Sequence, residues 1–106
     1  MPKRLSPIEQ YRRQVLEKDL RELVREFTVL FGWAFYFTHD ARRSPEGFPD
    51  LVLVRPPRVL FVELKRETEG LSREQGAWRL ALRDCPGVEY FLWGLRDADE
   101  IEETLR

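Results

Sequence analysis

The sequence predicts a mixed α/β fold in which helices pack on one small sheet. Three observations lead to this prediction: a long helix-period run near the N-terminus, two β-branched-rich runs around a proline-containing loop, and a helix–strand–helix order after them. The expected order is helix, three strands, helix, strand, helix. With 106 residues the chain has room for one core, so residues 1–106 are expected to form a single domain.

The first helix is expected over Pro7 to Phe31, where apolar side chains recur at three- and four-residue spacing. Gly32 then ends it. Trp33 to Thr38 alternates as a strand, and its aromatic side chains on one face are expected to pack on the sheet. Residues 39–49 form a polar loop with Pro, Gly and Ser.

A hairpin is expected from residues 51–54 and 59–64, on either side of Arg55-Pro56-Pro57-Arg58. Proline cannot adopt the positive φ of a primed two-residue turn, so the loop is expected to take all four residues. Val54 then pairs with Val59. Counting back through this register sets Asp50 directly opposite Glu63.

The remaining elements follow a short polar link at residues 67–70. A second helix is expected over residues 73–84, a last strand over 88–93 and a short acidic helix over 97–105. Cys85 is expected to be a buried residue at the end of the second helix.

Asp50 and Glu63 form the most informative pair in the chain. Like charges directly opposite each other on two strands are destabilising unless a cation lies between them. Strand alternation puts Lys65 on the same face as Glu63 and turns Leu64 into apolar packing. Two carboxylates suffice for magnesium, and a lysine beside them suits phosphodiester hydrolysis. The alternative for Glu63 and Lys65 is a solvated ion pair at a strand end.

Composition excludes several other classes. The apolar fraction of 42% indicates a folded globule, and no apolar run is long enough to span a membrane. No leader peptide is recognisable at Met1, and the lone Cys85 cannot form an internal disulfide, so an intracellular, cytoplasmic location is expected.

The net charge of −1 hides an uneven distribution, because residues 41–83 carry nine Lys and Arg against six Asp and Glu. A phosphate-binding rim around the acidic pair is one interpretation of this basic centre, and scattered surface arginines are the other. The rim would consist of Arg42, Arg43, Arg55, Arg58, Lys65, Arg66, Arg73 and Arg79.

These residues resemble the PD-(D/E)xK nuclease superfamily, with its restriction endonuclease-like core, and within it the VRR-NUC domain. That small nuclease module occurs alone in phages and bacteria. The resemblance runs from Glu17 to Trp93. It rests on Ser44, Gly47-Phe48-Pro49-Asp50-Leu51, Glu63-Leu64-Lys65, Gly70-Leu71-Ser72 and Gln75.

The resemblance implies that Asp50 and Glu63 bind Mg²⁺ or Mn²⁺, that the Leu64 carbonyl adds a ligand and that Lys65 assists the attacking water. Glu17 falls where the family has a first-helix glutamate that completes the acidic cluster. Asp19 borders the apolar stripe from the other side and is an alternative, as is a plain surface role for Glu17.

Gln75 has two interpretations. The resemblance makes it a catalytic residue that faces the metal site from the first turn of the second helix. Ser72-Arg73-Glu74-Gln75 also matches a capping box, in which Gln75 bonds back to the Ser72 backbone. Both can hold only if the side chain chooses the site over the cap.

The expected substrate is DNA. Arg42, Arg43 and Ser44, in the loop before Asp50, are expected to contact phosphates, as is Arg66. Standalone members of the group resemble Holliday junction resolvases, so a metal-dependent endonuclease for branched or flapped DNA, acting as a homodimer, is the leading hypothesis.

Three alternatives remain open. A restriction-type or single-strand nuclease would use the same fold on plain duplex or single strands. A non-catalytic nucleic-acid-binding module would depend on the arginines alone. A protein-interaction domain would use the acidic end, residues 97–103, but it leaves Asp50 opposite Glu63 unexplained.

Overall fold

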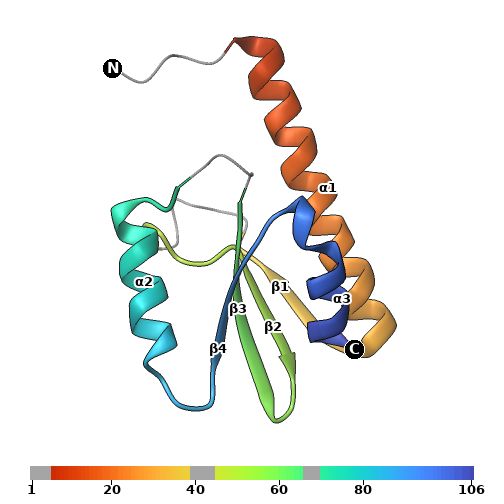
Figure 1. The fold of residues 1–106 in the computed structure, drawn as a ribbon, viewed down its shortest axis with the longest axis vertical. Helices are drawn as coiled ribbons and strands as arrows, with labels where there is room; N and C mark the ends of the chain where they lie inside the picture. Colours follow the sequence, from red (N-terminus) through yellow and green to blue (C-terminus); the bar gives the residue numbers. More distant parts are fainter. Residues whose placement is uncertain (1–5, 39–44, 66–69) are drawn as a thin grey trace.

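A four-stranded sheet with helices on both faces makes up the protein (Figure 1). The computed structural model describes residues 6–38, 45–65 and 70–106. Its elements are α1 (Pro7–Phe31), β1 (Ala34–Phe37), β2 (Leu51–Arg55), β3 (Arg58–Leu64), α2 (Arg73–Arg83), β4 (Glu89–Trp93), a 3₁₀ turn η1 (Leu95–Asp97) and α3 (Ala98–Leu105). The predicted α/β class and element order are confirmed.

α1 begins and ends where local chemistry dictates. Ser6 caps it, with the Glu9 N–H donating to Ser6 Oγ (3.2 Å) and the Ser6 N–H donating to Glu9 Oε2 (3.0 Å). Gly32 ends it in the left-handed region, at φ 79°, where a side chain would be strained. The N-terminal turns project beyond the body of the protein (Figure 1).

The sheet has the order β1-β2-β3-β4, with β1, β2 and β3 antiparallel and β4 parallel to β3. The predicted pairing of Val54 with Val59 is confirmed. α2 forms the crossover between β3 and β4, because two parallel neighbouring strands need a long connection, which is usually a helix.

The β2–β3 turn is shorter than predicted. Arg55 pairs with Arg58, so only Pro56 and Pro57 lie between the strands, and the peptide between them is cis. The prediction considered primed turns, which need positive φ, whereas a turn with a cis proline at its third position needs none.

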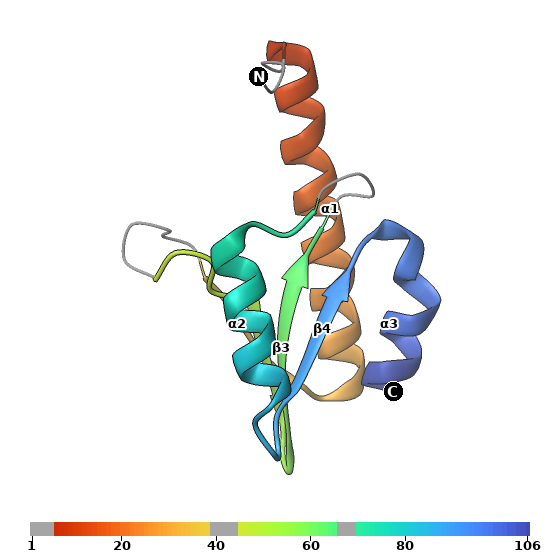
Figure 2. The same cartoon turned by 60° about the vertical axis from the view of Figure 1, so that its left-hand side comes forward.

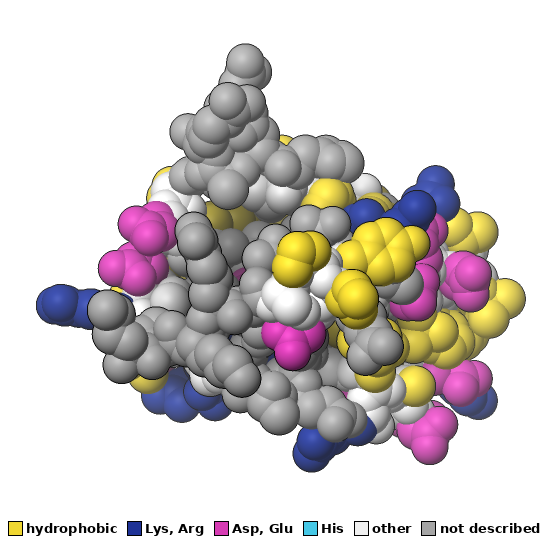
Figure 3. Space-filling view, turned by 90° about the horizontal axis from the view of Figure 1, so that it is seen from above, with side chains coloured by type: hydrophobic (Ala, Val, Ile, Leu, Met, Phe, Trp, Pro, Cys, Tyr) yellow, Lys and Arg dark blue, Asp and Glu magenta, His cyan; other side chains and the backbone are white. Residues whose placement is uncertain are grey.

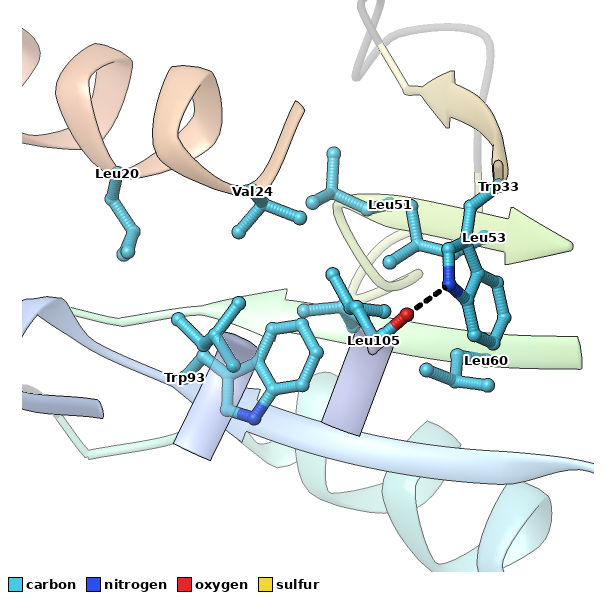
Figure 4. Close-up of a cluster of buried hydrophobic side chains, with 10 residues drawn as sticks. Leu20, Val24, Trp33, Leu51, Leu53, Leu60, Trp93 and Leu105 are labelled. Carbon is cyan, nitrogen blue, oxygen red and sulfur yellow. Dashed lines mark hydrogen bonds between the residues drawn. The ribbon is translucent and has the colours of Figure 1, made fainter. Parts of the chain in front are cut away.

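α1 and α3 cover one face of the sheet and α2 covers the other (Figures 1 and 2). The main core fills the space under α1 and α3, and its side chains come from both helices, from Trp33 and from alternate positions of the strands (Figure 4). It consists of Leu20, Val24, Trp33, Leu51, Leu53, Leu60, Val62, Trp93, Ile101 and Leu105. Alternation therefore leaves the other side chains of β2 and β3 for the α2 face.

The turn end of the hairpin holds the last turn of α3. Trp33 Nε1 donates to the Leu105 carbonyl (2.8 Å; Figure 4), and Arg55 Nη1 donates to the same oxygen (3.1 Å). Arg58 donates to the Thr104 carbonyl (3.0 Å) and forms a two-pronged pair with Glu89 (2.8 and 2.9 Å). These bonds satisfy carbonyls that a helix end leaves without partners.

Cys85 is exposed, not buried as predicted. It follows α2 at the turn into β4, where its thiol lies 3.3 Å from the Ala81 carbonyl oxygen. Among the described helices, none combines the length and apolar character needed to cross a bilayer.

Candidate active site

Two carboxylates meet at the open end of the β2–β3 hairpin. Asp50 directly precedes β2 and Glu63 lies near the end of β3. The last pair of the ladder at this end is Leu51 with Val62, so the next residue of each strand, Asp50 and Glu63, lies beside the other. The Leu64 N–H donates to Asp50 Oδ2 (2.9 Å) and fixes that carboxylate across the strands. Glu63 is only 3% exposed. Water therefore screens the acidic pair poorly.

The acidic pair opens into a pocket of about 360 Å³. α1 contributes one wall, the ends of β1 and β3 contribute the floor, and the first turn of α2 closes the other side. The lining residues are Glu17, Arg21, Phe37, Thr38, Asp50, Glu63, Leu64, Lys65 and Gln75.

Burial makes both carboxyls harder to ionise than in water. It raises the pKa of Asp50, although the hydrogen bond from the Leu64 N–H opposes this shift. Burial, together with the nearby charge of Asp50, raises the pKa of Glu63 from 4.5 to about 8. Lys65 counteracts both shifts only in part. The positive charge near the two carboxyls is therefore too small to keep both of them ionised near neutral pH.

Gln75 serves the helix cap and the site together, so the two interpretations are not exclusive. Its Oε1 accepts from the Ser72 N–H (2.8 Å), and the Gln75 N–H donates to Ser72 Oγ (3.1 Å), which completes the predicted capping box. The same Oε1 also accepts from Lys65 Nζ (2.9 Å), while Nε2 donates to Glu63 Oε1 (2.7 Å). The prediction treated the amide as having one useful end, but its oxygen and nitrogen each have a partner.

Lys65 is held from two sides. Its Nζ donates to Gln75 Oε1 and to the Gly70 carbonyl (3.1 Å). The Lys65 N–H donates to the Trp93 carbonyl (2.8 Å), which continues the β3–β4 pairing by one residue. An ammonium group has three donors, and the residues that the structure describes provide partners for two of them.

Gly47 lets the loop before Asp50 lie directly on the start of α2. A Cβ at this position would be 2.4 Å from the Glu74 carbonyl carbon and 2.6 Å from the Gln75 nitrogen. The residue also has φ +83°. The backbone that leads to one acidic residue therefore touches the helix turn that positions Gln75.

The donor set fits a hard divalent cation such as Mg²⁺ or Mn²⁺. Asp50 and Glu63 offer oxygen ligands on one side of the pocket, and such ions accept one or two carboxylates with water and phosphate oxygens completing the shell. Within residues 6–38, 45–65 and 70–106, no three His, Cys, Asp or Glu side chains are close enough to form a metal site alone. Leu64, whose carbonyl is the further ligand that the family resemblance implies, also lines the pocket.

Glu17 lies on the α1 wall of the pocket, and its charge contributes to the raised pKa of Asp50. Asp19, the alternative considered from the sequence, is exposed and does not line the pocket. The structure therefore favours Glu17 over Asp19 as the α1 acid of this site.

Arg21 lines the pocket one helical turn after Glu17, and the sequence analysis missed it. Its guanidinium carbon lies 4.2 Å from the centre of the Phe37 ring. The spacing of four residues from Glu17 on a helix was the available signal, because such residues share a face.

The predicted phosphate-binding rim is wrong for Arg55 and Arg58. Both lie at the turn end of the hairpin, opposite to Asp50 and Glu63, and their donors bond to helix-end carbonyls and to Glu89. The other proposed phosphate contacts, Arg42, Arg43, Ser44 and Arg66, lie outside the described residues.

Charge is mixed over the end of the protein where β3 ends. Figure 3 looks onto this end, and both acidic and basic side chains of the described residues are visible around it.

The four-stranded mixed sheet flanked by helices is an α/β fold of the restriction endonuclease-like class. The chain belongs to the VRR-NUC domain family, whose family model matches residues 6–94. A solved structure titled "VRR_NUC domain" superposes with a TM-score of 0.68 at 21% identity, covering 85% of this chain and 97% of that one. No curated protein matches the chain.

Proposed function

We propose that this protein is a divalent-metal-dependent endonuclease that hydrolyses phosphodiester bonds in DNA. One observation supports this above all: Asp50 and Glu63 lie side by side in a pocket that Lys65 shares, with Gln75 bonded to both Glu63 and Lys65. A purely structural ion pair between Glu63 and Lys65 would not need Asp50 beside it.

The residues take distinct roles in this proposal. Asp50 and Glu63 hold Mg²⁺ or Mn²⁺ with the Leu64 carbonyl, and Glu17 faces the same space from α1. When bound, the cation supplies charge stabilisation and acidifies a water molecule. Lys65 uses its ammonium to orient the attacking water or to offset negative charge on the phosphate. Gln75 keeps Lys65 and Glu63 in register.

The substrate in this proposal is branched or flapped DNA, and the working form is a homodimer. A four-way junction presents two equivalent strands, which suits a two-fold symmetric enzyme. The projecting turns of α1 support an association surface, because Ile8 and Tyr11 on them are 66% and 68% exposed. Sedimentation that shows only monomer at working concentrations would contradict the dimer.

Cleavage assays test the proposal directly. Labelled four-way junction, flap, single-strand and duplex DNA are each incubated with the protein in Mg²⁺, Mn²⁺ or EDTA. We expect metal-dependent cutting of the junction or flap, and its loss in Asp50→Asn. The matched control is Asp99→Asn, because Asp99 is an exposed acid on α3, away from the pocket.

Three results would contradict parts of the proposal. Full activity of Asp50→Asn would remove the acidic pair from the mechanism. Binding of DNA without cutting in any metal would favour the alternative function, a nucleic-acid-binding module. Preferential cutting of plain duplex or single strands would keep the nuclease and replace its substrate.

A further inference from the structure

A groove next to the proposed active site shares a wall with it. The α1–β1 groove has a volume of about 390 Å³ and is lined by Arg21, Glu22, Arg25, Phe35, Tyr36 and Phe37. Arg21 and Phe37 also line the pocket that contains Asp50 and Glu63. A chain-like ligand could therefore pass from the acids over this shared wall into the groove.

One row of α1 side chains marks this path. Glu17, Arg21 and Arg25 are spaced by four residues, which places them along one side of the helix. Glu17 lines only the pocket, Arg21 lines both spaces and Arg25 lines only the groove. The row thus changes from negative to positive with distance from the acidic pair.

Arg21 packs over the Phe37 ring on the wall that the pocket and the groove share. Its guanidinium carbon lies 4.2 Å from the centre of the Phe37 ring, and this contact orients the guanidinium plane without consuming its N–H donors. A planar guanidinium can bond two oxygens of one phosphate, which an ammonium cannot do in the same way.

We infer that the α1–β1 groove binds an unpaired stretch of the DNA strand next to the bond that is cut, with Arg21 holding the phosphate nearest the acids. This inference rests on the proposed nuclease function. Arginines beside aromatic side chains are the chemistry of single-strand binding, where cations follow the backbone and rings stack on bases. Tyr36 is 62% exposed at the groove.

Among the described residues that line the groove, Glu22 is the one acid, and it provides a test with the opposite sign. It forms a long ion pair with Arg25 (3.8 Å), and both side chains are about half exposed, at 45% and 59%. Such a pair is weak, so a phosphate can replace the carboxylate. Removal of the Glu22 charge should therefore strengthen binding of a polyanion.

The experiment measures binding without cleavage. Fluorescence anisotropy of a labelled oligothymidylate is followed in EDTA for the wild type, Arg21→Ala, Arg21→Lys, Arg25→Ala and Glu22→Gln. Arg83→Ala is the matched control, since Arg83 is an exposed arginine at the far end of α2. Circular dichroism melting verifies that each variant folds, and Arg21→Lys keeps the positive charge if Arg21→Ala does not fold.

We expect Arg21→Ala to weaken binding about tenfold at low salt, as loss of a charged hydrogen bond does. The salt slope of its log affinity should fall by about 1. Arg21→Lys should weaken binding less, and Glu22→Gln should strengthen it. If the wild type does not bind, or if Arg21→Ala and Arg83→Ala have equal effects, the proposal that the groove binds DNA is wrong.

The two proposals fail in different ways. Oligonucleotide binding that depends on Arg21, without metal-dependent cutting of any DNA, would keep the groove and remove the nuclease. Normal cutting by the wild type, with binding unchanged in Arg21→Ala, would keep the nuclease and remove the groove.

Discussion

Glu63 carries a charge that the metal-free fold disfavours. Because its pKa rises from 4.5 to about 8 on folding, the native state binds this proton more tightly than the unfolded state. The free energy of unfolding that this group contributes is therefore fully present below about pH 4.5 and is lost as pH rises towards 8.

We predict that Glu63→Gln, in EDTA, melts at a higher temperature than the wild type at pH 8, with a smaller difference near pH 5. An amide cannot ionise, so the variant lacks this pH-dependent loss. Thermal melts across this pH range measure the difference. A constant gap between the two proteins would show that Glu63 does not titrate in this window.

Lys65 is expected to act on rate more than on affinity. Lys65→Ala should lower the rate of cleavage by about 100-fold or more, because its ammonium is positioned by Gln75 beside the acidic pair, where charge develops. DNA affinity in EDTA should change little. Single-turnover rates beside binding constants separate the two, and the reverse pattern would make Lys65 a simple phosphate contact.

At the scale of elements, the contact between the Gly47 loop and α2 controls the position of Gln75. Gly47→Ala would force a Cβ into the Glu74 backbone at a residue with φ +83°. We predict a loss of stability of about 1–3 kcal/mol and a fall in cleavage rate, measured by denaturant unfolding and by single-turnover assay.

Gly76→Ala is the matched control for this prediction. Gly76 lies inside α2, and a Cβ there would meet nothing within 4 Å. Alanine should stabilise the helix by up to about 1 kcal/mol and leave the cleavage rate unchanged. Equal activity of the Gly47 and Gly76 variants would show that the loop does not position the helix.

The sequence predicted those parts of the site that depend on local pairing. The hairpin register follows from strand alternation, so Val54 could be paired with Val59 and Asp50 set beside Glu63. Arg21 was missed although it lies four residues after Glu17 on the same side of α1, because the sequence does not say how α1 is placed over the sheet. The proline turn was misjudged because two strand residues, Arg55 and Arg58, were assigned to the loop.

For the whole molecule, the two ends of the sheet have different tasks. The open end holds the acids and the pocket, while the turn end holds α3 through Trp33, Arg55 and Arg58. The register itself implies this separation, since residues beside a hairpin turn lie farthest from its open end. The rim interpretation grouped Arg55 and Arg58 with the acidic pair because it counted charge along the sequence and did not use the register.

Arg58→Ala tests this division of tasks. We predict that it destabilises the protein by about 1 kcal/mol, because it removes the bonds to Glu89 and to the Thr104 carbonyl. Affinity for DNA and cleavage below the melting temperature should stay unchanged. Weaker DNA binding in a folded Arg58→Ala protein would restore the rim interpretation.

The projecting turns of α1 are rigidly connected to one wall of the pocket. Ile8 and Arg21 lie on one continuous helix, about 20 Å apart along its axis. A helix is stiff over that length. A displacement of its first turns would therefore tilt the α1 wall of the pocket, while the sheet would keep Asp50 and Glu63 in place. A partner bound to the first turns of α1 would therefore change the distance between Arg21 and the acidic pair.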